Sequence, residues 1–87
     1  MKADLEQLSA RLQQLQPQEL NWTDDSHLHA GHAGAREGGH YRLRLVSPRF
    51  SGLSKVSRHR LIYDALGPLG PAGVHALQID ARAPDEA

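Results

Sequence analysis

The stretch HYRLRLVSPRFSGLSKVSRHRLIYDAL (residues 40–66) decides the fold, because two different hydrophobic periods follow one another in it. From 40 to 47 every second residue is apolar, which is typical of a strand with one buried and one solvated face. The alternating apolar residues are Tyr41, Leu43 and Leu45. From 53 to 67 the period is that of a helix, and Gly67 with Pro68 ends it. The helical stripe consists of Val56, His59, Ile62 and Leu66.

The rest of the chain adds one helix and two strands. ADLEQLSARLQQLQP (3–17) has leucines at helical spacing and predicts an N-terminal helix within residues 1–17, ended by Pro17. ELNWTDD (19–25) and VHALQIDAR (74–82) alternate as strands do. A loop rich in histidine and glycine fills 25–39, and we expect residues 83–87 to be a frayed tail. We therefore predict a single domain over residues 1–87 with the order α-β-β-α-β.

Connection rules convert this order into a three-stranded mixed sheet. Consecutive strands usually pair, so we expect the strands at 19–25 and 40–47 to be antiparallel. The helix between 40–47 and 74–82 makes a right-handed crossover, which places those two strands parallel. The resulting α/β (α+β) fold has both helices packed on one face of the sheet. Because the last strand then begins at the end of the sheet that carries the loop, His75 is predicted to lie close to the loop histidines.

The histidines are the candidate metal ligands. The chain has six histidines and no cysteine, so any metal that it binds alone must take nitrogen or oxygen ligands. His29 and His32 are three residues apart in a loop whose glycines allow it to close on one ion. His75 stands at the end of the apolar row of its strand, which favours a functional role. We expect His27 and His40 to cap or solvate polar surfaces, and His59 to be half-buried, hydrogen-bonded and structural.

The charged residues are segregated along the chain, although the formal net charge is zero. Between residues 36 and 60, Glu37 is the one acidic residue, whereas both ends of the chain are net acidic. The basic residues of this middle block are Arg36, Arg42, Arg44, Arg49, Lys55, Arg58 and Arg60. Such a block favours a negatively charged partner, either nucleic acid or an acidic protein face. Ordinary solvation of a strand face and a helix surface is the alternative.

Other classes of function have little support in the sequence. The acidic residues are not clustered, no serine has a recognisable nucleophile setting, and no glycine-rich phosphate loop follows a strand. We therefore do not expect an enzyme. Residues 1–16 lack the pattern of a signal peptide, and no apolar run approaches the length of a membrane span. A cytoplasmic protein with no membrane partner is the expectation.

Several short motifs, in the same order along the chain, resemble the BolA family. They are the VS-x-x-F-x-G turn (Val46, Ser47, Phe50, Gly52), the Arg-His-Arg of the helix (Arg58 to Arg60), Tyr63, and Val-His-Ala-Leu (Val74 to Leu77). The resemblance runs from about Asp24 to Pro84. It implies the α-β-β-α-β fold of that family, a KH-like (class II) arrangement, in agreement with the order derived above. We expect structural roles for His59, Phe50, Gly52 and Tyr63.

The resemblance also implies a partner and a cofactor. BolA-like proteins pair with monothiol glutaredoxins, and the two chains can share a labile [2Fe–2S] cluster together with the glutathione of the glutaredoxin. The BolA side supplies the histidine of Val-His-Ala-Leu, here His75, and a loop histidine or cysteine, here His32 or His29. Nitrogen ligands on one iron raise the potential of such clusters. No cofactor is expected in the isolated chain, which should be a monomer or weak dimer.

The alternative is a DNA-binding transcriptional regulator of the stress or morphology type, which the resemblance also allows. KH domains clamp a nucleic-acid backbone with a G-x-x-G loop. One such string here, Gly67 to Gly70, contains proline and leucine and follows the long helix. Contacts to duplex DNA would therefore depend on basic side chains, and so would contacts to an acidic partner. The candidates are Arg42, Arg44, Arg49, Lys55, Arg58 and Arg60.

Overall fold

A computed structural model describes residues 4–25 and 39–87 of the 87-residue chain. The helices are α1 (Leu5–Leu12) and α2 (Lys55–Leu66), and the strands are β1 (Glu19–Asp24), β2 (Gly39–Val46) and β3 (Val74–Arg82). Within the described ranges, three short 3-10 helices join or end them: η1 (Gln13–Leu15), η4 (Pro48–Phe50) and η5 (Pro84–Glu86). The element order α-β-β-α-β is confirmed.

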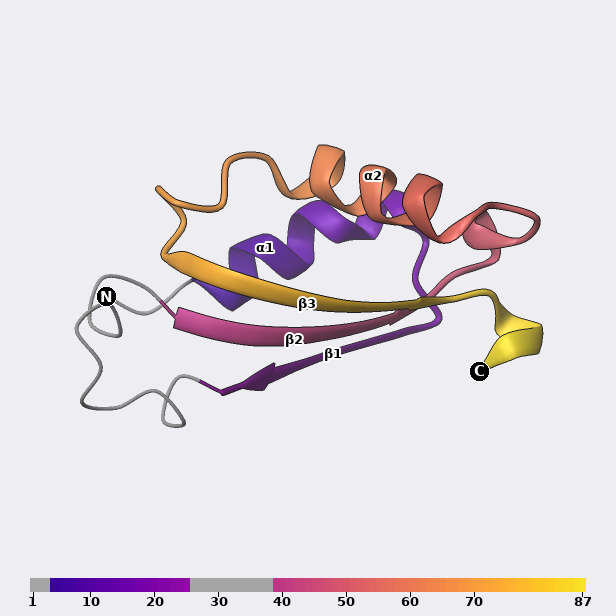
Figure 1. Ribbon diagram of the computed structural model, residues 1–87, viewed down its shortest axis with the longest axis horizontal. Coiled ribbons are helices and arrows are strands. Elements are labelled where there is room, and N and C mark those ends of the chain that lie inside the picture. The colour runs from indigo at the N-terminus through magenta and orange to yellow at the C-terminus, as the bar shows by residue number, and fades with distance from the viewer. Residues whose placement is uncertain (1–3, 26–38) are drawn as a thin grey trace.

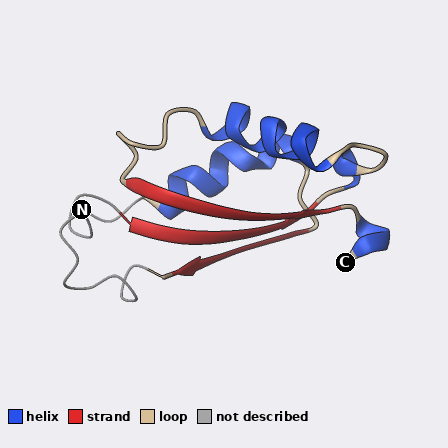
Figure 2. Cartoon of the chain, viewed as in Figure 1, coloured by secondary structure: helices blue, strands red, loops and turns tan. Residues whose placement is uncertain are grey.

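The sheet has the predicted topology. Its strand order is β1-β2-β3, with β1 antiparallel and β3 parallel to β2. Leu20 pairs with Leu45 across the antiparallel ladder, and Leu43 pairs with Ile79 across the parallel ladder, so the apolar residues of the three strands share one face. Both helices lie on that face, as Figures 1 and 2 show. The mixed three-stranded sheet with one helical layer is therefore confirmed.

The core lies between the sheet and the two helices. It is made of leucines from α1 and η1, the inward residues of β2, Phe50, and three residues from the last two turns of α2. Val74 at the start of β3 and Ala83 directly after its end complete it. Trp22 Nε1 on β1 donates to Ser9 Oγ on α1 at 2.8 Å, which joins the sheet to the helical layer. Within that layer, Arg11 of α1 donates to the Leu66 carbonyl of α2 at 2.8 Å. The second contact satisfies a carbonyl at the C-terminal end of α2, where a positive charge is favourable.

Helix boundaries follow from local capping. The Asp4 carboxylate accepts from the Gln7 amide at 3.0 Å and begins α1, and the Ser54 hydroxyl accepts from the Ser57 amide at 3.1 Å and begins α2. The N-terminal helix is shorter than residues 1–17, because α1 gives way to η1 before Pro17. The prediction that Val56 belongs to the buried stripe of α2 is wrong, because this side chain is 62% exposed. Instead, Ala65 joins Ile62 and Leu66 in the core.

The C-terminal tail differs from the expected frayed segment. Residues Pro84–Glu86 form η5, and Ala83 is buried in the core. Glu86 pairs with Arg58 of α2, through Nη1 and, at 2.8 Å, through Nη2. Arg58 also donates to the carbonyls of Leu53 and Ala81, at 3.0 and 3.2 Å. This arginine therefore joins the start of α2, the end of β3 and the tail.

Candidate metal-binding corner

One end of the sheet gathers the end of β1 and the beginnings of β2 and β3, at the left in Figure 1. Asp25, just after β1, donates its amide to the His40 carbonyl at 2.7 Å. Gly39, the first residue of β2, donates its amide to the Gly73 carbonyl at 2.9 Å, directly before β3. We call this end of the sheet, with His40 and His75, the histidine corner. The predicted meeting of the three strands at one end is therefore confirmed.

A bulge in β3 determines how His75 is presented. Gly39 pairs with Val74, but His40 pairs with Ala76, so His75 is an extra residue without a partner in the ladder. Bulges of this kind re-aim side chains and often occur next to functional sites. Val74 is buried and His75 is exposed. The sequence pattern had placed His75 in the inward row with Leu77, and the bulge overturns that assignment while leaving Leu77 inward.

The bulge brings His75 beside His40. The two imidazole rings have centroids 5.2 Å apart and planes inclined by 48°. His75 is exposed and His40 is half-buried. The sequence pattern predicts only a solvating role for His40 on a polar strand face; the structure makes it the ring neighbour of the candidate ligand. The sequence contains one sign of the bulge: Val74 and Leu77, both apolar and both turned inward, are three residues apart. In a regular strand, residues on the same face are an even number of positions apart.

The predicted loop ligands, His29 and His32, lie outside the described residues, as does His27, so their closeness to His75 stays a prediction. What the structure gives is the position of the loop's two anchors, Asp25 and Gly39, both at the histidine corner. In the described ranges 4–25 and 39–87, there is no group of three or more His, Asp or Glu side chains arranged to hold a metal ion.

The open face of the sheet, opposite the helices, carries the arginines of β2 in ion pairs. Arg42 binds Asp25 through Nε at 2.6 Å. Arg44 lies between two carboxylates, with Nε 2.5 Å from Glu19 and Nη1 3.1 Å from Asp80. Hydrogen bonding to Glu19 raises the pKa of Arg44. The acidic ends of the sequence thus fold onto its basic middle.

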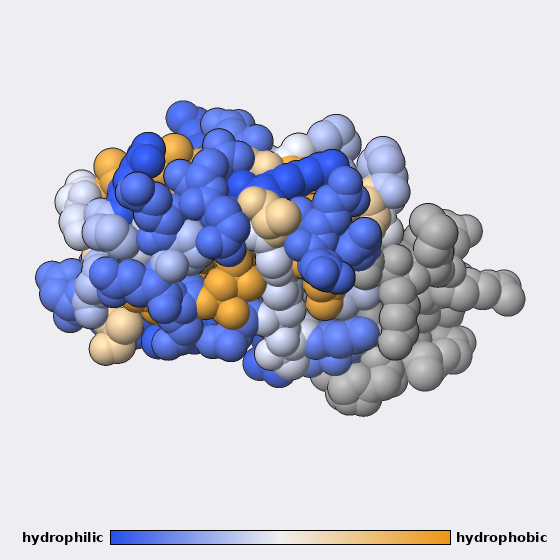
Figure 3. All heavy atoms as spheres, turned by 180° about the vertical axis from the view of Figure 1, so that it is seen from behind, coloured by the Kyte–Doolittle hydropathy of each residue, from blue (hydrophilic) through white to orange (hydrophobic). Residues whose placement is uncertain are grey.

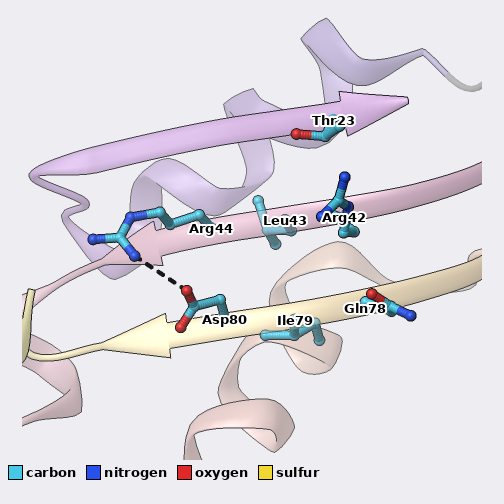
Figure 4. A pocket seen from close by; sticks show the side chains of 7 residues that line it. All are labelled: Thr23, Arg42, Leu43, Arg44, Gln78, Ile79 and Asp80. Atoms are coloured by element: carbon cyan, nitrogen blue, oxygen red, sulfur yellow. Dashed lines mark hydrogen bonds and ion pairs between the residues drawn. The ribbon is translucent and has the colours of Figure 1, made fainter. Parts of the chain in front are cut away.

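Asp80 also binds the last arginine of β3, so the pairs extend into a row. Arg82 Nε lies 2.9 Å from Asp80, and this hydrogen bond holds the pKa of the aspartate below its usual value. A hollow of about 310 Å³ opens among these side chains. Figure 4 shows its lining, with Arg42 and Arg44 from the middle strand and the Arg44–Asp80 pair drawn. The lining residues are Thr23, Arg42, Leu43, Arg44, Gln78, Ile79 and Asp80.

The remaining candidate basic residues do not share this face. On the helical side of the molecule, η4 and α2 carry the exposed side chains of Arg49, Lys55 and Arg60. Arg58, also on α2, binds Glu86 and the carbonyls of Leu53 and Ala81. The basic block of the sequence is therefore divided between two sides of the fold. In the view of Figure 3, hydrophilic residues dominate the surface and hydrophobic ones appear in small separate groups.

Comparison with known proteins identifies the family. A family model described as BolA-like protein matches residues 12–86. The chain belongs to the BolA family. Two solved BolA structures agree with its fold: the BolA domain of SufE1 from Arabidopsis thaliana (TM-score 0.77, 46% identity, 94% of this chain and 93% of that one) and BolA1 from Mus musculus (TM-score 0.75, 40% identity, 93% and 65%).

The BolA chain spans only part of some curated relatives. SufE-like protein 1, chloroplastic/mitochondrial, from Arabidopsis thaliana is 47% identical over 79 residues, which are 84% of this chain and 21% of that protein. BolA-like protein 1 from Mus musculus is 41% identical over 78 residues, which are 88% of this chain and 56% of that protein. The similarity therefore concerns the BolA domain. In the described part of the chain, no helix is both long and apolar enough to cross a membrane.

The family landmarks occupy distinct places in this BolA fold. Phe50 is fully buried, and Gly52 has a φ of +76°, a value that favours glycine. Tyr63 is 43% exposed and lies outside the core, which does not fit a core-packing role. His59 is half-buried, as expected, but its Nε2 is buried without a hydrogen-bond partner in the described structure. The hydrogen bond expected for His59 is thus missing at that nitrogen.

Proposed function

We propose that this BolA-family chain is a non-enzymatic adaptor that binds a monothiol glutaredoxin and shares a labile [2Fe–2S] cluster with it. The observation that carries the proposal is the presentation of His75 by the bulge, exposed and at the end of the sheet where the loop is anchored. An exposed neutral imidazole is a common metal ligand. The family membership supports the same role. Transfer of the cluster, or sensing of iron or redox state, would follow from such lability.

The donor set supports a shared cluster. The chain has no cysteine, so thiolate ligands would have to come from the glutaredoxin and its glutathione. Our chain would supply His75 and one of the loop histidines, His29 or His32. Replacing thiolates by neutral nitrogen ligands reduces the negative charge around the irons and raises their reduction potential. The cluster is the cargo that the two proteins hold between them.

The direct test is to mix the chain with a glutaredoxin that carries the cluster and to record visible absorption and circular dichroism. The unmodified chain should change both spectra. His75→Ala should abolish the change, and His29→Ala and His32→Ala, tested separately, should identify the loop ligand. His59→Ala is the control, since this residue lies on α2, and it should keep the response if far-ultraviolet circular dichroism shows a folded chain. A full spectral response from His75→Ala would refute the proposal.

The second candidate is a DNA-binding regulator that uses the open face of the sheet. Its support is the hollow flanked by Arg42 and Arg44. Both guanidinium groups already bind carboxylates, so phosphate contacts would have to displace Asp25, Glu19 and Asp80. Affinity for a duplex measured at two salt concentrations tests this candidate. If the face binds phosphate, replacing both arginines by glutamine should weaken binding and flatten its salt dependence; unchanged affinity would exclude this surface.

A further inference from the structure

The ring contact between His40 and His75 joins the proposed cluster ligand, His75, to a histidine that the proposed cluster ligation does not use. The two residues come from neighbouring parallel strands, and the bulge places their rings at a centroid separation of 5.2 Å. Two imidazoles that bind one tetrahedral ion, with each nitrogen about 2.0–2.1 Å from it, have centroids roughly 5 Å apart. The observed separation therefore suits a chelate without movement of either strand.

The backbone around the pair is held in place. The His40 carbonyl accepts from the Asp25 amide at 2.7 Å, and the amide of the preceding Gly39 donates to Gly73 at 2.9 Å. The Tyr41 ring also covers Gly39 so closely that a Cβ there would lie 2.2 Å from it. Because both strands are fixed at this point, the two rings are held near each other before any ion arrives. Such preorganisation reduces the cost of binding.

We propose that His40 and His75 form a two-nitrogen site for a divalent transition-metal ion, Zn²⁺ being the probe of choice, in the isolated chain. Imidazole suits zinc, copper and nickel, and water would fill the remaining positions. Asp25, whose amide donates to the His40 carbonyl, has its carboxylate bound by Arg42 at 2.6 and 3.3 Å. The site therefore has two protein ligands and open positions, which makes binding weaker than in four-ligand structural zinc sites. It needs no glutaredoxin.

The test is calorimetric titration of the full chain with Zn²⁺, without glutaredoxin, against three variants. His40→Ala and His75→Ala should each weaken binding at least about tenfold, because a single imidazole cannot chelate. The third variant replaces His27, His29 and His32 together by alanine and leaves the pair intact, so it should keep the affinity within about threefold. Loss of binding in the third variant, or unchanged affinity in His40→Ala, would overturn the proposal.

Two further measurements guard against misfolded variants. Thermal melting followed by circular dichroism reports whether His40→Ala is folded, and His40→Gln provides a second variant of similar length if it is not. In the unmodified chain, heteronuclear NMR should show Zn²⁺ shifting the imidazole nitrogens of both His40 and His75. Shifts confined to other histidines would refute the site. Because glutaredoxin is absent, the result is independent of whether the chain accepts a shared cluster.

Discussion

Ser47 is a buried hydroxyl whose removal should cost more than the loss of an ordinary helix cap. Its Oγ accepts from the Arg49 amide at 3.0 Å, which caps η4, and donates to the Leu15 carbonyl at 2.5 Å, which joins the turn to the N-terminal helix. Loss of a cap costs about 1 kcal/mol. Leaving the buried Leu15 carbonyl without a donor adds about 1–3 kcal/mol. Ser47→Ala should therefore lower the free energy of unfolding by about 2–4 kcal/mol.

Ser54→Ala is the matched control, because Ser54 caps α2 on the surface and its hydroxyl bonds only within its own turn. This variant should lose about 1 kcal/mol. For a domain of this size, 1 kcal/mol corresponds to about 4–8 °C in Tm. Urea unfolding and thermal melting of both variants measure the difference. Equal losses in the two variants would show that the Leu15 carbonyl finds another partner, and would refute the reasoning.

Two further perturbations address the histidine corner and the tail. Gly39→Ala should lower the free energy of unfolding by about 1–3 kcal/mol, because its Cβ would overlap the Tyr41 ring. In the control Gly70→Ala, where a Cβ meets nothing within 4 Å, the free energy of unfolding should change by no more than about 0.5 kcal/mol. Equal thermal stability of the two variants would contradict this prediction. Acid should release the tail, because the Arg58 hydrogen bond and the Ala83 amide lower the Glu86 pKa from 4.5 to about 2. The stabilisation is complete above the unfolded pKa and is lost as the pH falls from about 4.5 towards 2. Amide chemical shifts of the last residues should follow this change, and Glu86→Gln should remove it; tail signals that stay constant to pH 2 would contradict it.

The fold was predictable because its signals are local and strong. The alternation of β2, the leucine spacing of α1, and the glycine and proline after α2 each depend on neighbours in the sequence. The rule that crossover connections are right-handed then predicted the parallel pairing of β2 and β3. The tail was not predictable in this way, since its order depends on a contact between Glu86 and Arg58, 28 residues away.

The histidine corner was predictable in position but not in detail. Topology brought His75 to the correct end of the sheet, yet strict alternation gave it the wrong face, because one unpaired residue in β3 changes the parity. His40 was underestimated for the same reason: its ring neighbour comes from another strand through a register shift. The basic block was misleading for a different reason, because the sequence pattern does not reveal that the chain's own carboxylates bind Arg42 and Arg44.

The neutralised arginines of the open face have a kinetic consequence. A protein whose charges cancel within a few ångströms projects little field beyond a Debye length, so approaching molecules are not drawn to it from a distance. Encounter with a partner at this face should then proceed at the unsteered rate of about 10⁵–10⁶ M⁻¹s⁻¹ and vary little with ionic strength. Selection among partners would take place after collision, through the time that each complex survives.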